Sequence, residues 1–131
     1  MSYNLLLDTN FTKPNKHWKL TNCTYKTGYL LASSDVYSIE QTITLPDPTK
    51  LYFSMDYIAF DKDNIEKVYI GIQQGDLLET TIKKPKSKKR NKISVVYPVM
   101  QETITVKFIV EAKSKSSKIY IDSPILVDLC E

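Results

Sequence analysis

The stretch that decides the fold is "KIYIDSPILVDLCE" (residues 118–131). Ile119 and Ile121 alternate with Lys118, Tyr120 and Asp122. The sequence Asp-Ser-Pro then interrupts the alternation, and Leu126 and Leu129 follow it. An apolar period of two residues is typical of a strand that buries one of its faces. The chain is therefore expected to finish in a structural strand of a sheet.

The same alternation recurs upstream, between sequences that favour turns. "PDPTK" (46–50) contains two prolines, "DKDN" (61–64) is wholly polar, and Gly75-Asp76 ends a further apolar segment. No segment keeps a 3.6-residue apolar period over three turns, so long helices are not expected. About eight to ten short strands are predicted, spaced as in an antiparallel sandwich. The clearest of them are residues 36–45, 51–60, 67–75, 93–99, 103–112 and 118–129.

The length of 131 residues favours one domain, so a single β-sandwich covering residues 1–131 is expected. In such sandwiches the first and last strands commonly lie side by side. The strands around Leu5–Leu7 and Ile119–Leu129 are thus predicted to share a sheet.

The residues that enzymes of the common classes require are missing or isolated. His17 is the only histidine, no nucleophile-elbow or glycine-rich phosphate loop is present, and zinc-type clusters are absent. Asp56 and Glu66 are the kind of carboxylate pair that any sandwich of this size shows. Cys23 and Cys130 are too far apart for a metal or redox motif and are expected to be free thiols. The sequence predicts a protein that is not an enzyme and that carries no cofactor and no metal.

Positive charge is concentrated in "KKPKSKKRNK" (83–92), which holds seven basic residues and no acid. The whole chain carries +3, so the remainder is net acidic. We expect an exposed, mobile loop between strands, either merely solvated or bound electrostatically to an acidic protein surface or nucleic acid. The contact residues would be Lys83, Lys84, Lys86, Lys88, Lys89, Arg90 and Lys92.

A second candidate surface is an outward sheet face built by alternation. Tyrosine rings can stack on sugars, and polar side chains beside them can bind hydroxyl groups. The alternative is an ordinary polar sheet face. The candidate residues for glycan binding are Tyr52, Asp56, Tyr69 and Lys107.

The start of the chain, "MSYNLLLDTNF" (1–11), has no basic segment and only three consecutive leucines. It matches neither a signal peptide nor a membrane anchor, and no stretch approaches the ~20 apolar residues of a membrane span. No membrane partner is expected.

Three segments together resemble carbohydrate-binding-module-like jelly rolls, which are related to galactose-binding-like domains. "NLLLDTNFTKPNKHWKLTN" (4–22) resembles their opening, where an Asn-Leu-Leu start leads through Asn-x-Phe to a tryptophan. "YSIEQTITLPDPTKLYFSMDY" (37–57) is similar to the next part of the pattern, and "KIYIDSPILVDL" (118–129) to its closing strand. The resemblance implies an all-β, antiparallel β-sandwich of jelly-roll type.

Many members of that group hold a structural calcium between an acidic residue just after this phenylalanine and a late aspartate. Here Thr12 occupies the early position, which leaves Asp8 and Asp122 as candidate ligands. Calcium requires about six to eight oxygen ligands, and two carboxylates supply only a few of them, so no metal site is assigned.

Small stand-alone jelly rolls without export signals resemble components of bacteriophage particles. The resemblance implies a non-enzymatic structural or accessory module of a virion capsid, tail or fibre, made in the host cytoplasm. Its partners would be other virion proteins or copies of itself. The alternative function is a glycan-binding module that recognises host or environmental carbohydrate.

Overall fold

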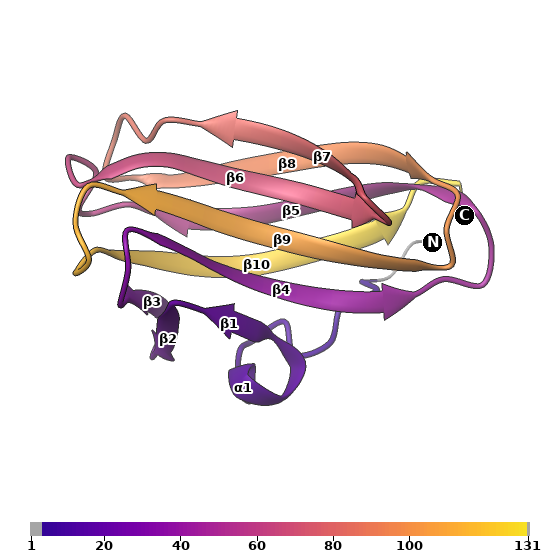
Figure 1. The fold of residues 1–131 in the computed structure, drawn as a ribbon, viewed down its shortest axis with the longest axis horizontal. Coiled ribbons are helices and arrows are strands. Elements are labelled where there is room, and N and C mark those ends of the chain that lie inside the picture. The colour runs from indigo at the N-terminus through magenta and orange to yellow at the C-terminus, as the bar shows by residue number, and fades with distance from the viewer. Residues whose placement is uncertain (1–3, 131) are drawn as a thin grey trace.

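The computed structural model describes residues 4–130, and within them it consists of ten strands and one short helix (Figure 1). The elements are α1 (Pro14–His17), β1 (Lys19–Thr21), β2 (Cys23–Lys26), β3 (Tyr29–Ala32), β4 (Val36–Thr44), β5 (Thr49–Ile58), β6 (Ile65–Gln74), β7 (Leu77–Lys83), β8 (Arg90–Val99), β9 (Thr103–Ala112) and β10 (Lys118–Asp128). The four-residue α1 is far too short to cross a bilayer, and no other helix occurs in the described residues.

The strands form two five-stranded sheets in the described part of the chain. Sheet A has the order β1-β4-β9-β6-β7, and sheet B has the order β2-β3-β10-β5-β8. The paired strands are antiparallel in both sheets. The all-β, antiparallel sandwich of jelly-roll type expected from the sequence is confirmed.

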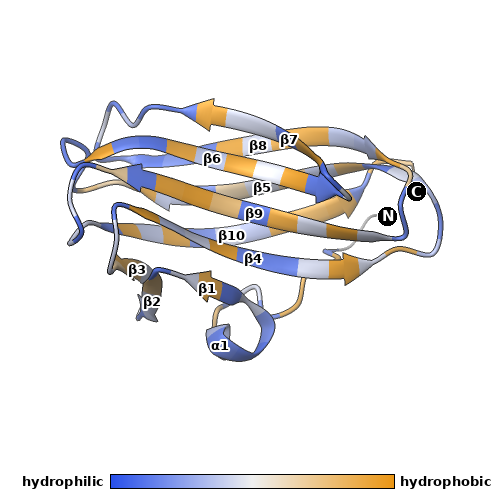
Figure 2. Ribbon diagram, viewed as in Figure 1, coloured by the Kyte–Doolittle hydropathy of each residue, from blue (hydrophilic) through white to orange (hydrophobic). Residues whose placement is uncertain are grey.

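The core lies between the two sheets and is built by alternate residues of the long strands. β9 buries Ile104, Val106, Phe108 and Val110, and the residues between them are only partly covered. Figure 2 shows this alternation as changes between orange and paler or blue segments along the strands. Trp18, which directly follows α1, is 3% exposed and belongs to this core. Removal of these apolar faces from water is the main force that holds the sheets together.

The strand predicted around Leu5–Leu7 does not form, although the described start of the chain does lie beside β10. One backbone bond joins Leu5 N to Leu126 O at 2.8 Å. The other contacts come from the Asn4 side chain, which donates to Pro124 O at 2.8 Å and accepts from Leu126 N at 3.0 Å. An amide side chain thus replaces the backbone pairing that a terminal strand would make.

A buried glutamine holds the next residue of this segment. The Gln41 side chain accepts a hydrogen bond from Leu7 N at 2.8 Å and donates one to Leu7 O at 3.0 Å. Because Gln41 belongs to β4 of sheet A, the N-terminal segment is tied to both sheets.

The basic block differs from the single loop predicted over residues 83–92. Lys83 is the last residue of β7, Arg90 and Lys92 belong to β8, and only residues 84–89 connect the strands. Within that connection Pro85 is buried. Strand pairing extends into the charged segment because the side chains of β8 can point outward while its backbone pairs with β5.

Candidate functional site

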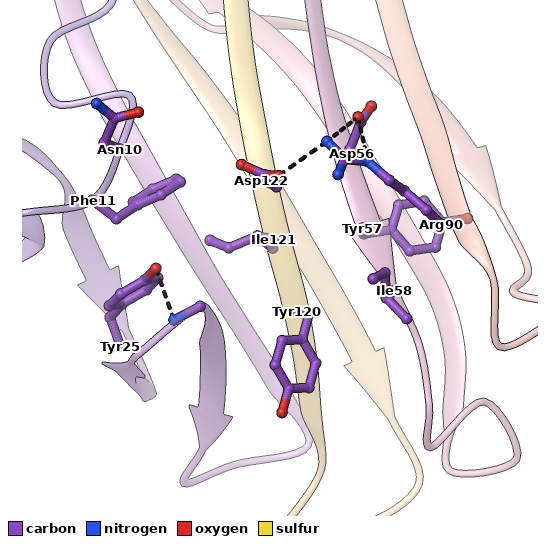
Figure 3. A pocket seen from close by; sticks show the side chains of 11 residues that line it. Asn10, Phe11, Tyr25, Asp56, Tyr57, Ile58, Arg90, Tyr120, Ile121 and Asp122 are labelled. Atoms are coloured by element: carbon purple, nitrogen blue, oxygen red, sulfur yellow. Dashed lines mark hydrogen bonds and ion pairs between the residues drawn. The ribbon is translucent and has the colours of Figure 1, made fainter.

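A hollow of about 320 Å³ opens on the outer face of sheet B. Figure 3 shows β10 running through it, with Asn10, Phe11 and Tyr25 on one side and Asp56 and Arg90 on the other. The remaining lining residues are Gly28, Tyr57, Ile58, Tyr120, Ile121 and Asp122.

The hollow forms where the regular pairing of β10 changes. β3 pairs only with residues 118–120 of β10, so the rest of that edge is left to the N-terminal segment. On the other side, the register with β5 shifts between Asp122 and Ile125, and Ser123 adopts a positive φ of 51°. Such a bulge bends a strand and redirects its side chains. The Asp-Ser-Pro sequence that interrupts the alternation is therefore the cause of the bulge.

Arg90 connects the carboxylates of two neighbouring strands, Asp56 of β5 and Asp122 of β10; we call these three residues the Arg90 cluster (Figure 3). Arg90 Nη2 lies 2.7 Å from Asp56 Oδ2 and 3.0 Å from Asp122 Oδ2, and Nε donates to Asp56 Oδ2 at 2.8 Å. The hydrogen bond to Asp56 raises the pKa of Arg90 further.

Burial differs sharply among these three side chains. Asp56 is 13% exposed, whereas Arg90 and Asp122 are 51% and 62% exposed. Asp56 Oδ1 is buried and accepts no hydrogen bond from the described residues, although Lys92 Nζ lies 3.8 Å from it. Asp56 is thus the least exposed member of the cluster, and Arg90 and Asp122 present donors and acceptors to solvent.

Tyr120, which lines the hollow, belongs to a group of aromatic side chains. The Tyr120 ring lies 5.1 Å from that of Tyr29 and 5.4 Å from that of Phe60, which meets it edge-on. Phe60 is 52% exposed, so part of this aromatic group faces solvent. Across β10, Phe11 stacks on Tyr25 with ring centroids 5.2 Å apart. The hollow therefore combines flat apolar surfaces with charged groups.

The loop that carries Asn10 and Phe11 is fixed by Asp8. Its carboxylate accepts hydrogen bonds from Thr12 N and Thr12 Oγ1, both at 2.8 Å, and from Lys13 N at 2.9 Å. Desolvation works against the ionised form, but these hydrogen bonds outweigh it and lower the pKa of Asp8. The Asp8 carbonyl also accepts from Trp18 Nε1 at 3.1 Å, so the loop is anchored to the core.

These contacts also bear on the two carboxylates considered for calcium. Asp8 is occupied within its own loop, and Asp122 pairs with Arg90 and accepts from Ser123 N. Among residues 4–130, no group of three His, Cys, Asp or Glu side chains is arranged to hold a metal ion.

The four residues predicted to form one glycan-binding face lie on opposite sides of the molecule. Tyr52 and Asp56 are outward residues of β5 in sheet B, whereas Tyr69 of β6 and Lys107 of β9 belong to sheet A. Alternation along a strand shows which residues share that strand's outer face, but not which sheet the strand enters. The prediction of a single face was wrong for this reason.

Arg90, Tyr120 and Asp122 were not predicted to meet Asp56. Tyr120 and Asp122 occupy outward positions of the last strand, which its alternation shows. Their approach to Asp56 follows from the pairing of β10 with β5, in which Asp122 lies opposite Asp56 and Tyr120 opposite Ile58. Apolar periodicity does not show that two strands more than sixty residues apart in the sequence, such as β5 and β10, are neighbours in a sheet.

The basic connection lies at one end of the sandwich, beside lysines from other loops. A second hollow of about 530 Å³ there is lined by Lys84 and Pro85 together with Lys62, Lys67 and Lys113. Asp63 and Glu66 also line it and partly offset the positive charge.

No protein-family model matches the chain, and no curated protein matches it in sequence. Similar solved structures do exist. The carbohydrate-binding module TmCBM61, solved in complex with β-1,4-galactotriose, aligns with a TM-score of 0.61 at 11% identity and covers 95% of this chain and 97% of its own. The xylan-binding module CBM15 aligns with a TM-score of 0.64 at 11% identity over 100% of this chain and 97% of its own.

A third structure is the enzymatically active domain of tailspike protein 4 from bacteriophage CBA120. It aligns with a TM-score of 0.67 at 14% identity and covers 96% of this chain, but the match spans only 21% of the tailspike chain. At these identities the likenesses show a shared fold, the jelly-roll sandwich that carbohydrate-binding modules and a segment of a phage enzyme both adopt.

Proposed function

We propose that this chain is a carbohydrate-binding module whose sugar site is the hollow on the outer face of sheet B. The observation that carries the proposal is that the Arg90 cluster and the ring of Tyr120 line one hollow. Ligand sites combine apolar walls with a few convergent polar groups, and this hollow has both.

The chemistry of the hollow suits a pyranose. The apolar C–H face of a sugar ring packs on an aromatic ring such as that of Tyr120, while its hydroxyl groups need both donors and acceptors. Arg90 supplies donors in a fixed planar arrangement and Asp122 supplies acceptors, and both remain about half exposed or more. The names of TmCBM61 and CBM15, which bind β-1,4-galactotriose and xylan, support the choice of ligand class.

We further propose that the protein binds sugar without cleaving it. Hydrolysis of a glycosidic bond requires one carboxyl group that can donate a proton and another that acts as base or nucleophile. In the hollow, the Oδ2 atoms of Asp56 and Asp122 lie 2.7 and 3.0 Å from Arg90 Nη2, so the guanidinium stands between the two carboxylates. A glycosidic bond would have to occupy that space, so the pair is not arranged for hydrolysis.

The test is binding of the full chain to a panel of plant, bacterial and host polysaccharides, followed by titration calorimetry with the best ligand. Tyr120→Ala and Asp122→Ala are expected to weaken binding by about tenfold or more, corresponding to roughly 1.4 kcal/mol. Thermal melting of each variant will show whether it remains folded.

Tyr69→Ala is the matched control, because it removes a tyrosine from the outer face of the opposite sheet. It is expected to leave binding unchanged, and Tyr52→Ala will show whether the site extends along β5. Loss of binding in Tyr69→Ala or Lys107→Ala, with Tyr120→Ala unaffected, would move the site to sheet A. Absence of binding to every polysaccharide would contradict the proposal.

A second candidate function is a structural module of a bacteriophage particle, acting through contacts with other virion proteins. The likeness to a segment of the CBA120 tailspike chain favours it. Adjacent capsid, portal or tail genes would support this function, whereas adjacent hydrolase genes would support the carbohydrate-binding module alone.

A further inference from the structure

β7 forms an open edge of the sandwich. It pairs with β6 over its whole length, from Leu77 opposite Gln74 to Lys83 opposite Val68, and within residues 4–130 no strand pairs with its other side. In Figure 1 it is the uppermost strand, on the side of the molecule away from α1. An open edge presents peptide N–H and C=O groups that can accept another strand.

The other edge strands of the two sheets are protected in the usual ways, and β7 is not. β1 and β2 have three and four residues, and β8 contains Pro98, which has no N–H to donate. β7 has seven residues, no proline and no shift of register with β6. It is a regular strand, open along its full length.

The side chains of β7 are also unusually apolar for an exposed edge. Leu77, Leu78 and Ile82 are 62%, 45% and 53% exposed, and they are three of the nine exposed large hydrophobic residues in the described chain. Exposed apolar residues concentrated along an unpaired strand mark a surface that another molecule covers.

We propose that β7 pairs with β7 of a second copy of this chain, in antiparallel orientation about a twofold axis at Thr80. The partner is a second copy because the strand is complementary to itself. Centring the pair on Thr80 places Leu78 opposite Ile82 of the second copy on the outer face, and the symmetry repeats this apolar contact. The ten strands of two A sheets then form one continuous sheet.

Charge complementarity supports the same arrangement. Glu79 and Lys83 lie on the same face of β7, because they are four residues apart in a strand of period two. In the register centred on Thr80, Glu79 lies diagonally opposite Lys83 of the second copy, within reach of these long side chains. Twofold symmetry makes two such pairs, so each copy contributes one acid and one base.

The hairpin fixes which peptide groups are free for this pairing. The two-residue turn Gly75-Asp76 places Gln74 opposite Leu77, and the closing pair of such a hairpin is hydrogen bonded. Every second residue from Leu77 onward therefore directs its peptide groups toward β6. Leu78, Thr80 and Ile82 direct theirs toward the open edge, and the register centred on Thr80 pairs all three with their counterparts.

Sedimentation velocity of the full chain, from low to several hundred micromolar, tests the proposal. A reducing agent is needed because Cys130 is exposed and can form disulfide-linked dimers. We expect a reversible dimer whose dissociation constant rises by about tenfold in Glu79→Lys and in Lys83→Glu, since each substitution replaces two attractive pairs with two repulsive ones. The double variant Glu79→Lys/Lys83→Glu restores opposite charges and should return the dissociation constant to near that of the unaltered chain.

Asp47→Lys and Lys26→Glu are the matched controls, because they make the same charge changes at exposed positions away from β7. Thr80→Pro removes one peptide donor from the centre of the open edge and should abolish the dimer without loss of fold. A chain that is monomeric throughout, or a dimer of equal strength in Thr80→Pro and both single charge variants, would overturn the proposal. The outcome is independent of the carbohydrate site, because β7 belongs to sheet A and the hollow to sheet B.

Discussion

Arg90 differs in its role from the lysines that surround it in the sequence. It neutralises Asp56, whose side chain is 13% exposed, whereas Lys86, Lys88 and Lys89 are exposed residues of the connection between β7 and β8. A buried carboxylate that loses its partner keeps its desolvation cost. We expect Arg90→Ser to lower the free energy of unfolding, because Asp56 keeps its position and loses its nearest cation.

The triple variant Lys86→Ser/Lys88→Ser/Lys89→Ser is the control for that substitution. It removes more charge from the same segment and should change the free energy of unfolding by less than about 0.5 kcal/mol. Urea denaturation measures both variants. Equal destabilisation in the two would show that Arg90 has no special role.

Tyr37 gives the fold a specific sensitivity to alkaline pH. Its side chain is 1% exposed, its hydroxyl accepts a hydrogen bond from Ser117 Oγ at 2.8 Å, and desolvation raises its pKa from 10.0 to about 12. Between these two values the folded state keeps a proton that the unfolded state loses, so stability falls as pH rises. The contribution of Tyr37 is complete below pH 10 and is lost as the pH passes through about 12.

Tyr37→Phe removes this ionisation while keeping the ring. Its free energy of unfolding should fall less steeply than that of the unaltered chain above pH 10, by about 1 kcal/mol per pH unit. Urea denaturation at a series of pH values gives the two slopes. Identical slopes would contradict the assignment.

Among the elements, β10 is the central strand of sheet B. It pairs with β3 at its start and with β5 along nearly its whole length, and it also holds the N-terminal segment. Deletion of residues 119–131 removes a central strand and exposes the apolar faces that it covers. We expect the truncated chain to be insoluble on expression, and a soluble, folded product would show that β10 is dispensable.

The sequence predicted the long strands well and the short ones poorly. β4, β5, β6, β9 and β10 are nine or more residues long and bury large apolar side chains at alternate positions, so a period of two is evident in their sequences. β7 was not predicted because it is an edge strand with adjacent exposed leucines and no buried face to impose a period. The candidate site was only partly predictable, because Asp56, Arg90 and Asp122 meet through strand pairing and not through any local pattern.

At the scale of the whole molecule, positive charge gathers at the end where the connection of residues 84–89 lies. Lys62, Lys67 and Lys113 line the same hollow as Lys84, so this end is more basic than residues 83–92 alone suggest. If it contacts a nucleic acid or an acidic protein surface, binding must weaken with salt because bound counterions are released.

Binding of a labelled single-stranded oligonucleotide at several salt concentrations checks this prediction. The slope of log affinity against log salt should be about −0.7 for each phosphate neutralised on a single strand, and the triple lysine variant should make it shallower. Binding that is insensitive to salt, or unchanged in that variant, would exclude an electrostatic role. Replacement of Asp47, which lies in the turn between β4 and β5, is a control that should leave the slope unaltered.

The bonds that join Asn4 and Leu5 to β10 have a consequence for engineering. Since the described start of the chain lies against the last strand, a short linker can connect the two ends without crossing the sheets. The order of the elements along the polypeptide is then separable from their arrangement in space. A circular permutant opened within residues 84–89 would keep every sheet pairing, because no strand is broken there. Neighbouring ends also allow the domain to be inserted into a surface loop of another protein.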